Sequence, residues 1–152
     1  MIRYILDTDH VSLFQREHPL VMQQVNATDP QTIAVTIITL EEQVYGRLNR
    51  IRRATSAESL VSAYAKLRDT WDFFSRINLL YFTQEAGDCY AELVRQRIRV
   101  GTQDLKIAAI ALSVKGIVVT RNQQDFCKVP GKRVGRLDGW GIGEVAIAFC
   151  NG

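Results

Sequence analysis

Short apolar runs alternate along the chain with longer stretches in which apolar residues recur at helical spacing. The runs cover residues 2–6, 32–38, 78–82 and 117–120, and a weaker one lies near 133–137. Their length and their β-branched residues are typical of strands. The run at 32–38 is almost continuously apolar, which is expected of a strand covered on both faces of a sheet.

The stretches between these runs predict helices. One is expected to open at Thr39, with Leu40, Val44, Leu48 and Ile51 on its apolar face. Strands that alternate with helices indicate an α/β fold, in which helices cover both faces of a mainly parallel sheet. The other predicted helices are a short one after residue 7, one after residues 55–58, one over about 84–99, and one from 102 to a stop at Gly116.

The helix after residues 55–58 carries two further signals. Its Thr-x-x-Glu start has the form of a capping box. Farther along, Tyr64, Trp71 and Phe74 lie on one stripe together with aliphatic residues. Such stripes usually face the interior, so this one is expected to be core, with a dimer contact or a partner-binding groove as the alternatives.

The composition is that of an ordinary globular chain. A length of 152 residues, 47% of them apolar and 23% charged, indicates a single domain over 1–152 with a core over about 2–140. No apolar run approaches the ~18 residues that a membrane span needs, and the start of the chain lacks a signal-peptide pattern. The three scattered cysteines show no C-x-x-C spacing, which predicts neither a zinc site nor a disulfide framework and indicates a reducing, cytoplasmic setting.

Charge alone does not identify a partner. The net charge of +3 is too small to indicate nucleic-acid binding. The basic residues are clustered, however, and each cluster is either a solvated helix face or a set of phosphate contacts. The clusters are Arg47, Arg50, Arg52 and Arg53; Arg95, Arg97 and Arg99; and Lys128, Lys132, Arg133 and Arg136.

Four acids are the main candidates for chemistry. Asp7 directly follows the first predicted strand, and Glu42 lies in the first turn after the second. Asp104 lies at the start of a predicted helix, and Asp125 follows the strand at 117–120. Carboxylates without His or Cys partners suit hard divalent cations such as Mg²⁺ or Mn²⁺. Metal-dependent phosphodiester hydrolysis is therefore the first hypothesis.

The predicted topology brings these acids to one edge of the sheet. Sites in open parallel sheets lie beyond the carboxyl ends of the strands, where Asp7, Glu42 and Asp125 are expected. The helix that begins near Asp104 spans roughly 18 Å and must run antiparallel to the strand after it. Asp104 therefore returns to the level of Thr120, at the end of that strand.

Each acid also has an ordinary structural role open to it. These roles are a capping box with Thr39 for Glu42, a helix-dipole contact for Asp104, an N-cap for Asp7 or Asp9, and a turn for Asp125. Four acids at one sheet edge are harder to explain in this way. Facing carboxylates repel one another, and a divalent cation removes that conflict.

Four segments of the chain resemble, in order, the motifs of the PIN-domain nucleases, and in particular the VapC-type toxins of bacterial toxin–antitoxin pairs. The segments are I-L-D-T-D at 5–9, I-T-x-x-E-x-x-Y-G at 38–46, G-x-x-D-x-x-I-A-A at 101–109 and T-R-N-x-x-D-F at 120–126. Each motif alone is weak, but four in order are fairly specific. Together they extend over nearly the whole chain.

The resemblance implies a three-layer α/β/α sandwich around a mainly parallel five-stranded sheet. It also implies a Mg²⁺- or Mn²⁺-dependent endoribonuclease acting on RNA, with tRNA as one candidate, a homodimer and an inhibitory antitoxin partner. By position, Asp7, Glu42 and Asp104 become metal ligands, directly or through water. The Tyr-Gly pair at 45–46 selects Glu42 over its neighbour Glu41.

The fourth position of the family pattern is filled by either Asn122 or Asp125. An amide is a weaker ligand than a carboxylate, so Asp125 is favoured as the fourth acid and Asn122 as an orienting or water-binding group.

Four neighbours of these acids have open roles. Thr8 and Thr120 could hydrogen-bond ligands or phosphate, or they could cap helices. Arg121 could contact phosphate or pair with an acid, and the two are not ranked. His10 is expected at the surface or in a cap rather than in the site.

Three other functions are weighed against nuclease activity. A phosphoacceptor signalling domain needs an Asp after the third strand, where the chain has Tyr81-Phe82-Thr83. A nucleotide-binding module needs a glycine-rich phosphate loop, and neither common form is present. A PIN-like domain that binds RNA or a protein without cutting is the alternative. It would be marked by a lost acid, and the first three are all kept.

Overall fold

The computed structural model describes residues 1–130, 132–135 and 145–149, which form an α/β fold around one mixed sheet. The strand order is β3-β2-β1-β4-β6-β5. Four strands are parallel: β1 (Tyr4–Leu6), β2 (Ile33–Thr36), β3 (Asn78–Leu80) and β4 (Ile117–Thr120). The antiparallel pair at the edge consists of β6 (Val145–Phe149), next to β4, and β5 (Lys132–Gly135).

The α/β class and the mainly parallel sheet are confirmed, but the expected count of five strands was wrong for the described part of the chain. The weak run near 133–137 forms β5 as far as Gly135, and its last two positions lie outside the described residues, as does the region of Trp140. The strand β6 was not predicted. Its sequence, Val-Ala-Ile-Ala-Phe, carried an apolar signal that could have found it.

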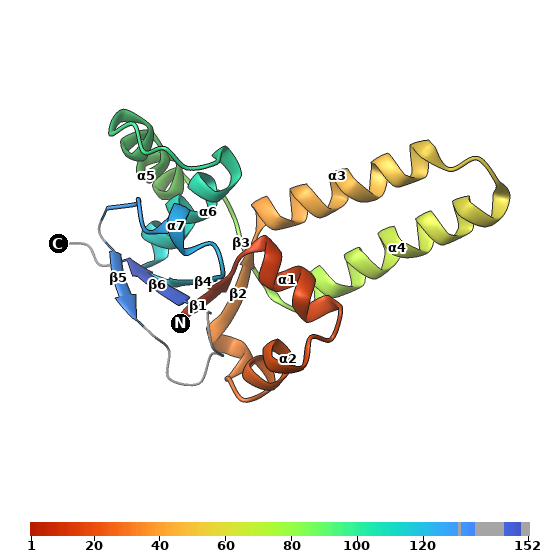
Figure 1. Cartoon of the computed structure of the whole chain (residues 1–152), viewed down its shortest axis with the longest axis horizontal. Helices are drawn as coiled ribbons and strands as arrows, with labels where there is room; N and C mark the ends of the chain where they lie inside the picture. Colours follow the sequence, from red (N-terminus) through yellow and green to blue (C-terminus); the bar gives the residue numbers. More distant parts are fainter. Residues whose placement is uncertain (131, 136–144, 150–152) are drawn as a thin grey trace.

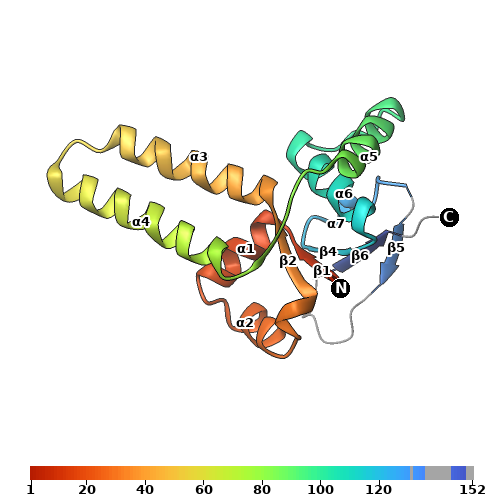
Figure 2. The ribbon, with the colours of Figure 1, turned by 180° about the vertical axis from the view of Figure 1, so that it is seen from behind.

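Helices cover both faces of the sheet (Figures 1 and 2). On one side lie α1 (Thr8–Gln15) and α2 (Pro19–Asn26), and on the other α5 (Gln84–Arg95) and α6 (Thr102–Val114). A short helix, α7 (Gln123–Phe126), follows β4. Two long helices, α3 (Ile37–Arg53) and α4 (Ala57–Ser75), form a hairpin that projects away from the sheet. We call this hairpin the arm.

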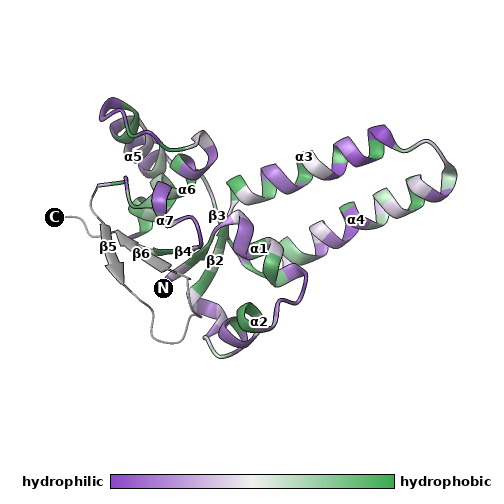
Figure 3. Ribbon diagram, in the orientation of Figure 1, coloured by the Kyte–Doolittle hydropathy of each residue, from purple (hydrophilic) through white to green (hydrophobic). Residues whose placement is uncertain are grey.

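The three-layer arrangement follows from the alternation of side chains along the strands. Ile5 and Val118 pack with residues of α5 and α6 in one core cluster. Their neighbours Leu6 and Val119 pack on the opposite face in a second cluster, together with Phe74. Figure 3 shows the corresponding hydrophobic colour in β2 and β4. Because both faces of the central strands are buried, their sequences read as continuous apolar runs.

The start of α3 differs from the prediction in a way that matters for the site. Thr36 is its N-cap, and the Thr36 hydroxyl accepts a hydrogen bond of 3.4 Å from the backbone N–H of Thr39. Thr39 is therefore the third helical residue and not the opener. Glu42 lies in the second turn, so the alternative role considered for it, a capping box with Thr39, does not occur.

Two other helix ends also differ from the prediction. The capping box of α4 is formed by Ser56 and Ser59, one residue later than expected. At the end of α6 the left-handed residue is Lys115, with φ of 54°, and not the glycine after it. Gly116 has a packing role instead, because a Cβ there would lie 2.6 Å from Cδ1 of Ile5.

The aromatic stripe of α4 lies mostly outside the core, so the expectation that it is core was wrong for two of its three members. Tyr64 is 57% exposed and Trp71 is 74% exposed, whereas Phe74 is buried. The arm projects away from the sheet, and the residues of α4 that pack in the core cluster with the sheet come from its end, at Phe73 and Phe74. None of the described helices, the long α4 included, is apolar enough over a sufficient length to cross a membrane.

This difference in burial predicts unequal effects on stability. Phe74→Ala should lower the free energy of unfolding by about 3–5 kcal/mol, because it removes a buried ring and leaves a cavity. Trp71→Ala should change it by no more than about 0.5 kcal/mol. Urea denaturation followed by circular dichroism measures both values. Equal losses for the two variants would contradict this placement of the stripe.

Candidate metal centre

Asp7 is held at the carboxyl end of β1, next to the end of β4. It is the N-cap of α1 and only 4% exposed. Its Oδ1 accepts a 2.8 Å hydrogen bond from the backbone N–H of His10, and its Oδ2 accepts a 2.7 Å bond from the Thr120 hydroxyl. The structure therefore places Asp7 both in the N-cap of α1 and at the carboxyl ends of the parallel strands.

Glu42 is connected to the residue that follows Asp7. The hydroxyl of Thr8 donates to Oε1 of Glu42 at 3.0 Å and lies 2.9 Å from the hydroxyl of Thr39. Glu41 is exposed and accepts from Nε2 of Gln103 at 3.0 Å. The two adjacent glutamates therefore have different environments, and Glu42 is the one that contacts the β1 end.

Asn122 connects the remaining two acids. Its side-chain nitrogen donates to Oδ2 of Asp104 at 3.1 Å and to Oδ2 of Asp125 at 3.0 Å. Asp125 also accepts a bond of 3.3 Å from the ammonium group of Lys128. The start of α6 and the segment after β4 are thus brought together, as the topology argument predicted. The amide orients both acids, and the choice of Asp125 as the fourth ligand stays a prediction.

The four neighbours with open roles lie as follows. Thr8 and Thr120 both donate to acids, as described above. Arg121 lies 3.9 Å from Asp9, and both side chains are about half exposed, so the pair is a weak surface ion pair. His10 was expected at the surface or in a cap. Its backbone N–H donates to Asp7, which is the N-cap of α1, and its side chain is fully buried and not at the surface.

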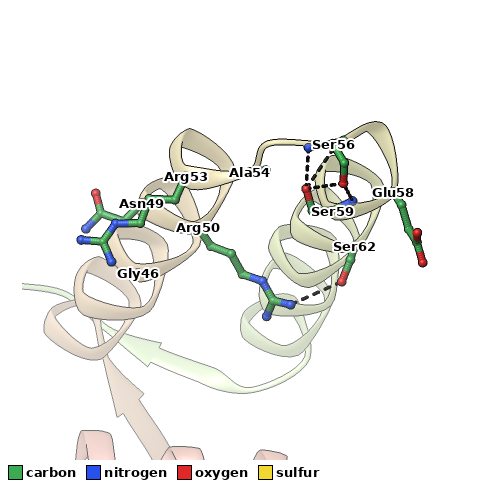
Figure 4. A pocket seen from close by; sticks show the side chains of 9 residues that line it. All are labelled: Gly46, Asn49, Arg50, Arg53, Ala54, Ser56, Glu58, Ser59 and Ser62. Atoms are coloured by element: carbon green, nitrogen blue, oxygen red, sulfur yellow. Dashed lines mark hydrogen bonds between the residues drawn. The ribbon is translucent and has the colours of Figure 1, made fainter.

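A cleft of about 350 Å³ opens between these elements. Its lining is Asp7, Thr8, Asp9, Ser12, Asp104 and Asn122. A larger hollow of about 780 Å³ lies between α3 and α4 of the arm (Figure 4). That hollow is lined by arginine, asparagine and serine side chains, with Glu58 as its single acid. The smaller cleft is therefore the better candidate for chemistry.

The electrostatics of the cleft show that the charges of the other three acids act on Asp104. Burial raises the pKa of Asp104 above its usual value, and the nearby charge of Asp7 raises it further, with smaller contributions from Asp125 and Glu42. The hydrogen bond from Asn122 partly opposes this shift. The pKa of Asp125 is lowered, because Asn122 and then Lys128 donate to its carboxylate. The repulsion is thus concentrated at Asp104.

The carboxylates around the cleft suit a hard divalent cation that keeps some of its water. They do not form a closed structural metal site. In the described part of the chain, no group of three or more His, Cys, Asp or Glu side chains is arranged to hold a metal ion by itself. Mg²⁺ does not need such a cage, because it keeps several of its waters and uses one or two carboxylates together with substrate phosphates. Asp7 and Asp104, which line the cleft, can supply the one or two carboxylates that such an ion needs.

Comparison with known proteins identifies the class. Residues 4–132 match the model of the PIN domain family, so the chain belongs to this family. It is 30% identical over 138 residues to the tRNA(fMet)-specific endonuclease VapC of Salmonella typhimurium, over 88% of this chain and 97% of that protein.

Solved structures agree with this assignment. The chain is similar to DNA-bound VapBC from Salmonella typhimurium, with a TM-score of 0.69 and 26% identity over 86% of this chain and 95% of that one. It is also similar to VapBC-5 of Mycobacterium tuberculosis, a member of the VapBC family of toxin–antitoxin systems. There the TM-score is 0.54 and the identity 27%, over 86% of this chain and 93% of that one. The resemblance to PIN-domain, VapC-type proteins is confirmed.

The raised pKa of Asp104 predicts how stability depends on pH without metal. Its folded-state pKa lies above the unfolded value, so ionised Asp104 opposes folding, and the penalty grows as pH rises through the folded-state pKa. Asp104→Asn should therefore raise the thermal midpoint at pH 7 in chelator-treated buffer. The gain should vanish below about pH 3.9, where the carboxyl is protonated in both states.

Asp125→Asn is the matched variant with the opposite sign. The pKa of Asp125 is lowered, so its charge favours folding above the unfolded pKa. Its loss should lower the midpoint at pH 7. A lower midpoint for Asp104→Asn under the same conditions would contradict the repulsion described here.

Proposed function

We propose that the chain is a Mg²⁺- or Mn²⁺-dependent endoribonuclease that hydrolyses RNA phosphodiester bonds, and that it is the toxin of a toxin–antitoxin pair. The main support is the electrostatic conflict at Asp104, which faces the charges of Asp7, Asp125 and Glu42. A divalent cation bound between these carboxylates would replace their mutual repulsion with attraction to the ion. Membership of the PIN family and similarity to proteins named VapC support the same reading.

In this proposal Asp7 and Asp104 would hold the cation, and Glu42 and Asp125 would contact it directly or through water. A bound ion supplies a water of lowered pKa and stabilises charge on the phosphate oxygens. Hydrogen bonds between side chains orient the four acids. Thr120 orients Asp7, Thr8 orients Glu42, and Asn122 orients the other two acids.

The proposed substrate is RNA, and tRNA is the first class to test. The relative from Salmonella typhimurium is named for tRNA(fMet), which supports this choice. The arm offers a basic surface, because Arg50, Arg52 and Arg53 are exposed there. Arginines of this kind neutralise backbone phosphates without reading sequence. They would contribute affinity, and the cleft would contribute the chemistry.

An antitoxin partner is part of the proposal. Its support is the similarity to solved VapBC proteins, one of which is described as a member of a toxin–antitoxin family. A homodimer and a cytoplasmic location stay predictions.

The proposal predicts metal-dependent cleavage of structured RNA by the purified chain. Asp7→Asn and Asp104→Asn should each lower the rate by more than about 100-fold, the upper end of the loss for groups that only support a ligand. Glu41→Gln is the matched control and should keep the wild-type rate, because Glu41 is exposed and contacts Gln103. Gel analysis of labelled tRNA with Mg²⁺, Mn²⁺ or chelator measures all four proteins.

Two outcomes would count against the proposal. Equal residual cleavage in the wild type and in both Asn variants would indicate a contaminating nuclease. RNA binding without any cleavage would favour the non-catalytic PIN-like domain.

A second experiment tests the fourth position. If Asp125 contacts the cation, Asp125→Asn should raise the Mg²⁺ concentration for half-maximal cleavage by about 10-fold. Lys128→Gln removes the other partner of Asp125 while keeping the carboxylate, so it should have a much smaller effect. If Asp125→Asn keeps the wild-type Mg²⁺ requirement while Asn122→Ala loses cleavage, Asn122 and not Asp125 fills the fourth position.

A further inference from the structure

His10 stands out as a fully buried imidazole against a candidate ligand. It is the third residue of α1 and is 0% exposed. Its Nδ1 lies 3.0 Å from Oδ1 of Asp7. An ionised carboxylate can only accept hydrogen bonds, so Nδ1 must carry the proton of this bond.

The ring bond is additional to the helix cap. The cap itself is the 2.8 Å bond from the backbone N–H of His10 to Oδ1 of Asp7, which any residue except proline at position 10 could donate. Helix α1 therefore does not require an imidazole. What the ring adds is a second donor on the same oxygen atom, which restrains rotation of the carboxylate.

Counting donors shows which atom of Asp7 is left. A carboxylate offers about four lone-pair positions, two on each oxygen. Oδ1 receives both bonds from His10, and Oδ2 receives one bond from Thr120. Among the contacts of the described residues, one acceptor position therefore remains, and it is on Oδ2.

We propose that His10 is a positioning residue of the metal centre. Its ring occupies the second acceptor position of Oδ1 of Asp7, so that Oδ2 is the atom left to bind a divalent cation. This inference rests on the proposed function and adds a role that the acidic motifs do not contain. The two hydrogen bonds on Oδ1 and the one on Oδ2 hold the carboxylate plane in place before the cation arrives. A preset ligand binds more tightly because less freedom is lost on binding.

Two near-isosteric variants separate positioning from packing. His10→Asn keeps a side-chain N–H close to the place of Nδ1, whereas His10→Leu has almost the same shape and no donor. Both leave a similar gap, so both should lower the thermal midpoint by similar amounts. Val11→Ala is the control, because Val11 is a fully buried neighbour on α1 whose side chain makes no hydrogen bond to Asp7.

Affinity for Mn²⁺, measured on the full chain by calorimetry and by electron paramagnetic resonance, is the readout. His10→Leu should weaken binding by about 10-fold or more, which is typical for the loss of a partner behind a ligand. His10→Asn should stay close to the wild type, and Val11→Ala should lose stability without losing affinity.

Three results would overturn the inference. The first is wild-type affinity in His10→Leu. The second is an equal loss of affinity in His10→Leu and His10→Asn, or in Val11→Ala, which would mean that packing alone is responsible. The third is a wild-type chain that binds no Mn²⁺, which contradicts the proposed function itself and is distinct from the first two.

Discussion

The candidate site depends above all on the buried hydrogen bond from the Thr120 hydroxyl to Oδ2 of Asp7. This bond is 2.7 Å long and joins residues 113 positions apart in the sequence. It can form because β1 and β4 are parallel neighbours in which Leu6, the last residue of β1, is in register with Val119, so that Asp7 follows beside Thr120. The same hydroxyl accepts a 2.9 Å bond from the backbone N–H of Asn122, so the loop after β4 is fixed by the same contact. The ends of two strands therefore set the position of the cleft.

The cleft carries a cost that the rest of the fold offsets. Asp104 is partly withdrawn from water and faces other carboxylates, and both conditions disfavour its charge. Two well-packed clusters, one on each face of the sheet, supply stability elsewhere in the molecule. Such a conflict is commonly retained where it serves function, and a divalent cation is the simplest partner that relieves it. The conflict and the proposed chemistry therefore have one physical origin.

The class of fold and the convergence of the acids could be predicted from sequence, because both follow from the order of strands and helices. Local detail could not. The periodicity after β2 did not distinguish Thr36 from Thr39 as the cap, since both can accept the same kind of bond. The stripe containing Trp71 has the spacing of a core stripe, but spacing does not report whether anything packs against it. His10 was misplaced for a similar reason, because the burial of its ring depends on what packs against α1.

The most direct test of the central claim is the location of a bound cation. A crystal of the wild-type chain soaked in Mn²⁺ should show an anomalous peak in the cleft between Asp7 and Asp104, within coordination distance of Oδ2 of Asp7. The ion should complete its coordination mostly with water. A crystal with an open cleft and no anomalous peak there, or with its Mn²⁺ bound elsewhere on the chain, would contradict the account.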